Sequence, residues 1–296
     1  MKSAFFQDLS PWHKLLMLFV FMFMSTVLFV LLAGELSQAI WGIDLAQTDF
    51  DTLEESQFAD HRNANVLSTF LFQVGAFLMS TLAFFQYAEA SISKRIGIGK
   101  GIMRGVDWVW VTIIGALLAF GAIFISSLSS EVMALLPGLN EMAESASEEY
   151  NSKTGFMLSG GLSAAALSVL VIGIIAPLCE EFFYRSGVQG YLLKISRKPW
   201  HAIVVTAIVF AIMHFEFTGF VTRFTLGLVL GWVYYKSGSI WPSVIIHAGI
   251  NTVQIILEYI QHSEYGLAEW VKIMPAACTL LAGISLYVLY RSFKTR

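Results

Sequence analysis

Charged residues and cysteines are scarce in this sequence. Asp, Glu, Lys and Arg make up 13% of the 296 residues, whereas hydrophobic residues make up 56%; an average soluble domain has about 25% charged residues. The two cysteines, Cys179 and Cys278, lie in apolar runs without the spacing of a disulfide framework or a metal knuckle. A net charge of −3 provides no basic surface, so we expect no nucleic-acid partner. This composition excludes an ordinary soluble protein and indicates a chain embedded in a lipid bilayer.

Apolar windows of about 20 residues, long enough to cross about 30 Å of hydrocarbon, recur along the whole chain. The first window has no small-residue cleavage site before Glu35, so we interpret it as a retained helix and not as a signal peptide. The sequence thus predicts an all-α polytopic membrane protein with a single transmembrane domain over residues 1–296. We expect about eight transmembrane helices, at residues 15–34, 66–88, 108–128, 163–193, 200–217, 219–236, 240–259 and 271–290.

The loop charges predict the orientation of these helices. With the N-terminus in the cytoplasm, most Lys and Arg residues fall in cytoplasmic loops, and only Arg62, Lys153 and Lys272 fall on the opposite side. The positive-inside rule therefore places both termini in the cytoplasm. The two acidic loops, about 35–65 and 129–158, are expected outside, and we assign them no chemistry. A compact chain without targeting extensions fits a bacterial cytoplasmic membrane.

Costly polar side chains cluster in the apolar windows after residue 176. A carboxylate or histidine in a membrane helix costs at least a few kcal/mol, so such a residue usually faces the protein interior and marks a functional site. Hydrogen bonding between helices is the structural alternative for any one of them. The cluster occupies three segments, PLCEEFFYR, FAIMH and HAGIN, and consists of Glu180, Glu181, Arg185, His214, His247 and Asn251.

Helix geometry allows these side chains to meet. If the fourth helix continues to residue 193, Glu180 lies as deep as His214, about 21 Å from the cytoplasmic end at 1.5 Å per residue. Such a helix is too long to stand upright, which implies a tilt or a kink at Pro177. Residues four apart share a face, which pairs Glu181 with Arg185 and leaves Glu180 free to act as a general base.

Two further pairs share a face by the same spacing. Phe210 and His214 would place an aromatic ring against an imidazole, and His247 and Asn251 would project together. The motifs Glu180-Glu181-x-x-x-Arg185, Phe210-x-x-x-His214 and His247-x-x-x-Asn251 follow one another on successive late helices. This arrangement is similar to the three motifs of the CAAX-processing and bacteriocin-processing (CPBP, or Abi) intramembrane proteases, relatives of the type II CAAX prenyl endopeptidases. The resemblance covers a motif-bearing core at about residues 163–255.

The resemblance implies an intramembrane endopeptidase whose site opens toward the cytoplasmic leaflet. It implies that Glu180 deprotonates a water molecule and that His214 helps bind and polarise that water. His247 and Asn251 would donate hydrogen bonds to the oxyanion, while Glu181 with Arg185 would brace the helix. The expected partners are the bilayer itself and a membrane-associated protein or peptide substrate.

Three alternatives stay open at this point. The same Glu180, His214 and His247 form a His₂Glu set that zinc hydrolases use, although the sequence has no HExxH motif; we favour hydrolysis without a metal or other cofactor. A transporter would use these groups to relay protons or hold a cation. A degenerate family member would act only as an immunity or scaffold protein. The sequence does not identify the substrate, any prenyl group on it, or the oligomeric state.

Overall fold

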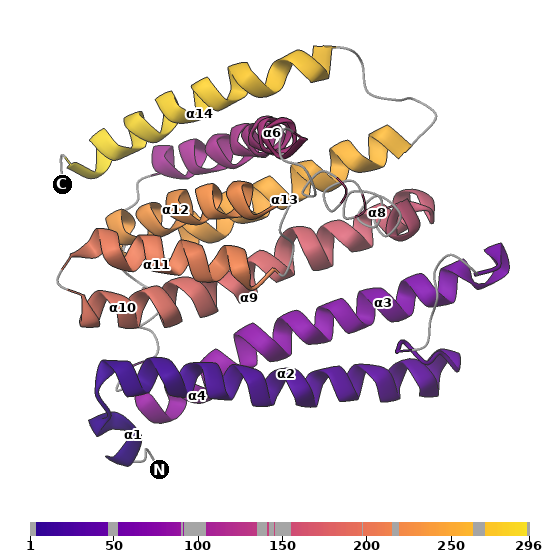
Figure 1. Cartoon of the computed structure of the whole chain (residues 1–296), viewed down its shortest axis with the longest axis horizontal. Coiled ribbons are helices and arrows are strands. Elements are labelled where there is room, and N and C mark those ends of the chain that lie inside the picture. The colour runs from indigo at the N-terminus through magenta and orange to yellow at the C-terminus, as the bar shows by residue number, and fades with distance from the viewer. Residues whose placement is uncertain are drawn as a thin grey trace.

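The computed structural model describes residues 4–46, 53–89, 91, 105–134, 141, 145, 155–196, 198–214, 219–262 and 270–294. Within these ranges every regular element is a helix, and the helices pack as a bundle of long, roughly aligned rods (Figure 1). This confirms the all-α expectation for the described part of the chain. Residues 47–52 of the first acidic loop and most of residues 135–154 in the second lie outside it.

The N-terminal part contributes two long rods. A short helix α1 (Ala4–Asp8) precedes α2 (Pro11–Trp41), whose start is capped by Ser10 and whose end is marked by Gly42 at φ 69°. A 3₁₀ turn η2 (Glu55–Gln57) leads into a continuous rod made of α3 (Phe58–Phe72), the π-helical segment η3 (Gln73–Met79) and α4 (Ser80–Ala88). The next helix is α6 (Gly105–Ala134).

The central rod runs from Gly161 to Ile195 and carries the first sequence motif. It consists of α8 (Gly161–Ser168), π-helical η4 (Val169–Ile175), α9 (Ala176–Glu181), π-helical η5 (Phe182–Gln189) and α10 (Gly190–Ile195). The long fourth helix expected from the depth of Glu180 is therefore present. Pro177, which has no N–H to donate, follows directly on the wider π-helical winding.

Four helices complete the bundle: α11 (Pro199–Ile212), α12 (Phe220–Ser237), α13 (Trp241–His262) and α14 (Trp270–Lys294). In Figure 1, α11 begins and α12 ends at the same end of the bundle, and neither helix extends to the other end. At 14 residues, α11 is about 21 Å long, less than the about 30 Å of a hydrocarbon core.

This hairpin changes the predicted number of spans. Six helices in the described part of the chain are long and apolar enough to cross a membrane, and α11 and α12 are not among them. The expected count of eight is therefore not confirmed. The windows 200–217 and 219–236 each passed as apolar in sequence, but α11 ends at Ile212, and α12 carries Arg223 and Lys236. Because α11 ends at Ile212, His214 lies just beyond this helix, with its ring against Phe210.

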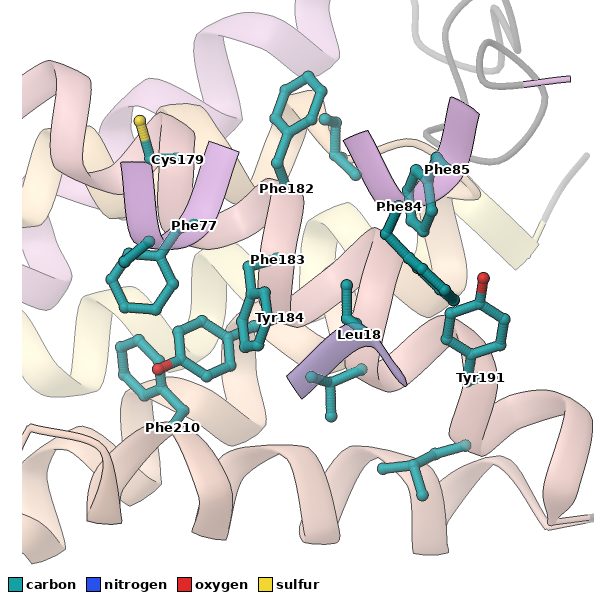
Figure 2. Packing of buried hydrophobic residues seen from close by; sticks show 14 of the residues in the cluster. Leu18, Phe77, Phe84, Phe85, Cys179, Phe182, Phe183, Tyr184, Tyr191 and Phe210 are labelled. Carbon is teal, nitrogen blue, oxygen red and sulfur yellow. The ribbon is translucent and has the colours of Figure 1, made fainter. Parts of the chain in front are cut away.

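Aromatic side chains fill the space between the N-terminal rods and the central rod. Figure 2 shows Phe77 of η3 beside Tyr184 of η5, which lies against Phe210 of α11. The ring centroids are 5.7 Å apart in the first pair and 5.1 Å apart in the second. The first pair is tilted and the second is edge-on, and aromatic pairs of this kind contribute about 0.5–1.5 kcal/mol each beyond the burial of their area. They hold η3, η5 and α11 in fixed register around the polar cluster.

Candidate active site

A buried ion pair forms the floor of the polar cluster. Nε of Arg185 donates to Oε2 of Glu181 at 2.8 Å, and Nη2 donates to Oε1 at 3.3 Å. Both side chains are completely buried. The i,i+4 pairing expected from the sequence is present, and its bidentate geometry is the strong form of an arginine–carboxylate contact. Removing one member would leave the other charge buried and unpaired.

His247 lies between the two adjacent glutamates. Its Nδ1 donates to Oε1 of Glu181 at 3.1 Å, and its Nε2 lies 3.9 Å from Oε2 of Glu180. The imidazole and both carboxylates are almost fully buried. Glu181 therefore fixes the orientation of the ring, as the acidic member of a catalytic triad does, and directs Nε2 toward Glu180.

Glu180 presents its two oxygens differently. Oε1 accepts a hydrogen bond from Nε2 of Gln73 at 3.1 Å. Oε2 is buried and has no hydrogen-bond partner among the described residues. A buried, unpartnered carboxylate oxygen that faces an imidazole nitrogen is expensive to maintain, and such groups are concentrated at functional sites.

His214 joins the cluster through Phe210. Their ring centroids are 4.7 Å apart in an edge-on arrangement, and Nδ1 of His214 donates to the carbonyl oxygen of Phe210 at 2.7 Å. Phe210 also contacts His247, at 5.7 Å between ring centroids, and lies beneath the guanidinium of Arg185. The predicted pairing of Phe210 with His214 is thus present, and Phe210 connects both histidines.

Asn251 lies one turn beyond His247 on α13, with its amide on the central rod. Its Nδ2 donates to the carbonyl oxygen of Ile172 at 3.1 Å, and the neighbouring Thr252 hydroxyl donates to the carbonyl oxygen of Gly173 at 3.5 Å. One of the two N–H bonds of the Asn251 amide is therefore engaged with backbone. The proposed oxyanion role of Asn251 falls to its second N–H bond and stays a prediction.

Two glutamines belong to the cluster and were missed in the sequence. Gln73 reaches Glu180, and Gln189, which is fully buried, donates from Nε2 to the carbonyl oxygen of Gly231 at 2.8 Å. An amide is less costly in a membrane than a carboxylate, so these residues gave a weaker signal than the glutamates. The available sign was the position of Gln73 at the centre of an otherwise apolar window, LFQVG.

Neither of the two serines near the motifs is positioned as a nucleophile. The Ser186 hydroxyl donates to the carbonyl oxygen of Phe182, and the Ser243 hydroxyl donates to the carbonyl oxygen of Leu230 at 2.9 Å. Both are fully buried and engaged with backbone. A nucleophilic hydroxyl needs an adjacent base, and their contacts are with helix carbonyls instead.

The zinc alternative requires Glu180, His214 and His247 to converge on one ion. Among the residues that the structure describes, no group of three His, Cys, Asp or Glu side chains is arranged to hold a metal ion. Nδ1 of each histidine is directed to an oxygen of the protein, which leaves Nε2 of each ring available, as in histidines that bind a metal. The expectation of hydrolysis without a metal therefore stays a prediction.

The comparisons with known proteins address the segment that carries these residues. Residues 162–253 match the family described as Type II CAAX prenyl endopeptidase Rce1-like. This match confirms the resemblance inferred from the three motifs, and its bounds nearly coincide with the expected core at 163–255.

Two curated proteins are similar over a comparable length. The "UPF0177 protein YxdF" of Lactococcus lactis is 32% identical over 82 residues, which are 27% of this chain and 44% of that protein. The "Putative membrane peptidase YdiL" of Bacillus subtilis is 23% identical over 97 residues, which are 33% of this chain and 39% of that protein. The matches thus span less than half of either relative. No solved structure matches. Together, the family and the peptidase relative support a membrane protease in general terms.

Proposed function

We propose that this chain is an intramembrane endopeptidase that hydrolyses a peptide bond with a water molecule activated by Glu180. The observation that carries the proposal is the buried pair of Oε2 of Glu180 and Nε2 of His247, 3.9 Å apart, with the imidazole held from behind by Glu181. One water molecule at a hydrogen-bond distance of about 2.8 Å fits against both atoms. Such a water lies within reach of a general base, as hydrolysis requires.

In the proposed reaction, Oε2 of Glu180 takes a proton from this water while the water oxygen attacks the carbonyl carbon. The electron pair of the C=O double bond moves onto its oxygen and forms the oxyanion of a tetrahedral intermediate. The intermediate then expels the leaving nitrogen as the C–N bond breaks, and Glu180 returns the proton to that nitrogen. The products are a carboxyl group and an amine, and Glu180 is regenerated.

Stabilisation of the oxyanion falls to His247 and Asn251. With protons on both ring nitrogens, His247 donates to Glu181 from Nδ1 and to the oxyanion from Nε2. The buried charges of Glu180, Glu181, Arg185 and His247 then sum to zero, which lowers the cost of keeping them in an apolar interior. The free N–H bond of Asn251 supplies the second donor. One such donor contributes about 3–4 kcal/mol to transition-state stabilisation.

His214 positions the attacking water. Because its Nδ1 donates to the carbonyl of Phe210, a neutral His214 presents Nε2 as an acceptor. A water that donates one hydrogen to Nε2 of His214 and the other to Glu180 directs its lone pair at the substrate. We further propose that the substrate is a membrane-associated protein or peptide, that the site opens toward the cytoplasm of a bacterium, and that no metal takes part.

Comparative proteomics of membranes tests the proposal while the substrate is still unidentified. Cells carrying the wild-type chain, Glu180→Gln or Glu131→Gln are compared for new protein termini and for accumulated uncut precursors. Glu131 is an exposed glutamate of α6 and provides the matched control. We expect at least one precursor that accumulates with Glu180→Gln and is cut normally with Glu131→Gln. Identical terminus profiles for all three at good coverage would contradict a protease function.

A further inference from the structure

The side chain of Gln73 contacts the proposed base from a part of the chain that no comparison matches. Gln73 is the first residue of η3 in the N-terminal rod, whereas the family match covers residues 162–253. The segments η3 and α9 pack side by side, and Nε2 of Gln73 donates to Oε1 of Glu180 at 3.1 Å. The two residues are separated by 107 positions in the sequence.

Gln73 is the donor and Glu180 the acceptor in this hydrogen bond. A carboxylate only accepts hydrogen bonds, so the amide of Gln73 must present its NH₂ group to Glu180. This occupies Oε1 and leaves Oε2, which has no partner among the described residues, facing Nε2 of His247. The two oxygens are chemically equivalent, and the hydrogen bond from Gln73 fixes the plane of the carboxylate so that one oxygen is held and the other faces His247.

The surroundings of Gln73 hold it in place. Phe77, one turn further along η3, packs on Phe183 and Tyr184 of the central rod, at 5.4 and 5.7 Å between ring centroids. On the opposite side, a Cβ at Gly75 would lie 2.2 Å from the ring of Phe29, so η3 approaches α2 as closely as glycine permits. Gln73 is therefore positioned by contacts on two sides of its own segment.

We propose that Gln73 is a positioning residue for catalysis, which holds one oxygen of the Glu180 carboxylate so that the other faces His247 and receives the proton of the attacking water. The inference rests on the proposed hydrolytic function. It assigns the N-terminal rods a direct part in the chemistry, beyond enclosing the motif-bearing core.

The test compares Gln73→Met, which keeps the volume and removes the donor, with Gln73→Glu, which keeps the shape and adds a second carboxyl group. Gln38→Met, at an exposed glutamine of α2, is the control. The readout is kcat as a function of pH for the full-length purified protein, with a substrate found by the proteomic comparison. We expect a 10- to 100-fold lower kcat for Gln73→Met, with little change in KM, and an acid limb moved to higher pH.

Gln73→Glu should move the acid limb further in the same direction, because two carboxyl groups in contact share a proton at pH values where Glu180 alone is ionised. A merely structural role predicts no movement of the pH profile in either variant. If Glu180→Gln is inactive and both Gln73 variants keep the wild-type profile, the positioning role is wrong and the proposed function stands. If Glu180→Gln retains wild-type activity, the proposed function itself fails.

Discussion

The side-chain amide of Asn251 donates to the carbonyl oxygen of Ile172, five residues before Pro177. In π-helical winding this carbonyl would pair with the N–H of residue 177, and in α-helical winding the carbonyl of Gly173 would do so. Proline has no N–H. The hydroxyl of Thr252 approaches the Gly173 carbonyl. Pro177 leaves one of these two carbonyls without its usual donor, and two adjacent side chains of α13 reach both of them, as membrane helices require.

This relationship predicts that the stability cost of Asn251→Ala depends on Pro177. In the wild-type background, the substitution should lower the free energy of unfolding by about 1 kcal/mol, within the range of membrane hydrogen bonds. In a Pro177→Ala background, the restored N–H pairs with the carbonyl of Ile172 in π-helical winding, and the cost should fall close to zero. Unfolding in mixed micelles measures both values. An equal cost in both backgrounds would contradict this role of Asn251.

The same pair of backgrounds separates the structural role of Asn251 from the catalytic one. If its second N–H bond serves the oxyanion, the double variant Pro177→Ala/Asn251→Ala should remain stable and still lose about 10²- to 10³-fold in kcat relative to Pro177→Ala alone. Recovery of full activity together with stability would assign Asn251 to the helix backbone only. Steady-state kinetics on the detergent-purified variants provides the measurement.

Stability and activity should both depend on the buried ion pair of Glu181 and Arg185. Glu181→Gln removes the charge that pairs with Arg185 and orients His247, so we expect a loss of about 3 kcal/mol in unfolding free energy and of most activity. Lys194→Met is the contrasting variant, since Lys194 is 45% exposed and its Nζ lies 3.4 Å from Glu89. That surface pair should contribute less than about 1 kcal/mol. If the two variants lost a similar free energy of unfolding, burial would not account for the strength of the Glu181–Arg185 pair.

The α11–α12 hairpin should not tolerate a methyl group at Gly227. A Cβ there would lie 3.0 Å from both Cα and Cβ of Ala207, so α12 would have to move away from α11. We expect Gly227→Ala to destabilise the protein by about 1–3 kcal/mol and to lower kcat, because α11 carries Phe210. Gly34 of α2 has no atom within 4 Å of its added Cβ, so Gly34→Ala should be neutral or stabilising by up to about 1 kcal/mol. Equal thermal unfolding midpoints for the two variants would contradict the close contact.

Removal of metal ions should leave activity unchanged. The purified protein is dialysed against a strong chelator, analysed for zinc and assayed before and after. We expect no stoichiometric zinc and the same kcat, since in the proposed reaction side chains of the protein activate the water and stabilise the developing charge. Stoichiometric zinc whose loss abolishes activity, and whose return restores it, would favour the zinc alternative and reverse the proposed role of His247.

The sequence was most informative at polar side chains whose insertion into a membrane costs the most free energy. Carboxylates and imidazoles inside apolar windows stand out against their surroundings, so Glu180, Glu181, Arg185 and His247 could be grouped from the order of residues alone. Their pairing followed from helical spacing, and the Glu181–Arg185 contact was predicted correctly. The hydrogen bond of His247 to Glu181 was not predicted, because a spacing rule relates residues of one helix and not the rotation of one helix against another.

Features that depend on packing rather than on composition were harder to predict from the sequence. An apolar window does not reveal how much of it forms one continuous helix, so the expectation of full spans at α11 and α12 is not confirmed. A lone glutamine carries little cost, so Gln73 gave no strong signal. Its contact with Glu180 depends on η3 and α9 lying together. That adjacency follows from aromatic packing between distant parts of the chain.

The central claim is that Glu180 activates the hydrolytic water. It is tested most directly by the kcat of purified Glu180→Gln on a substrate identified by proteomics, beside the wild-type protein and the exposed Glu131→Gln control, with the unfolding midpoint of each measured in the same detergent. Glutamine keeps the shape of the side chain and removes the base. We predict a loss of at least about 10³-fold in kcat for Glu180→Gln, with a folded protein and an unaffected control. A folded Glu180→Gln protein that turns over within tenfold of the wild type would contradict the claim.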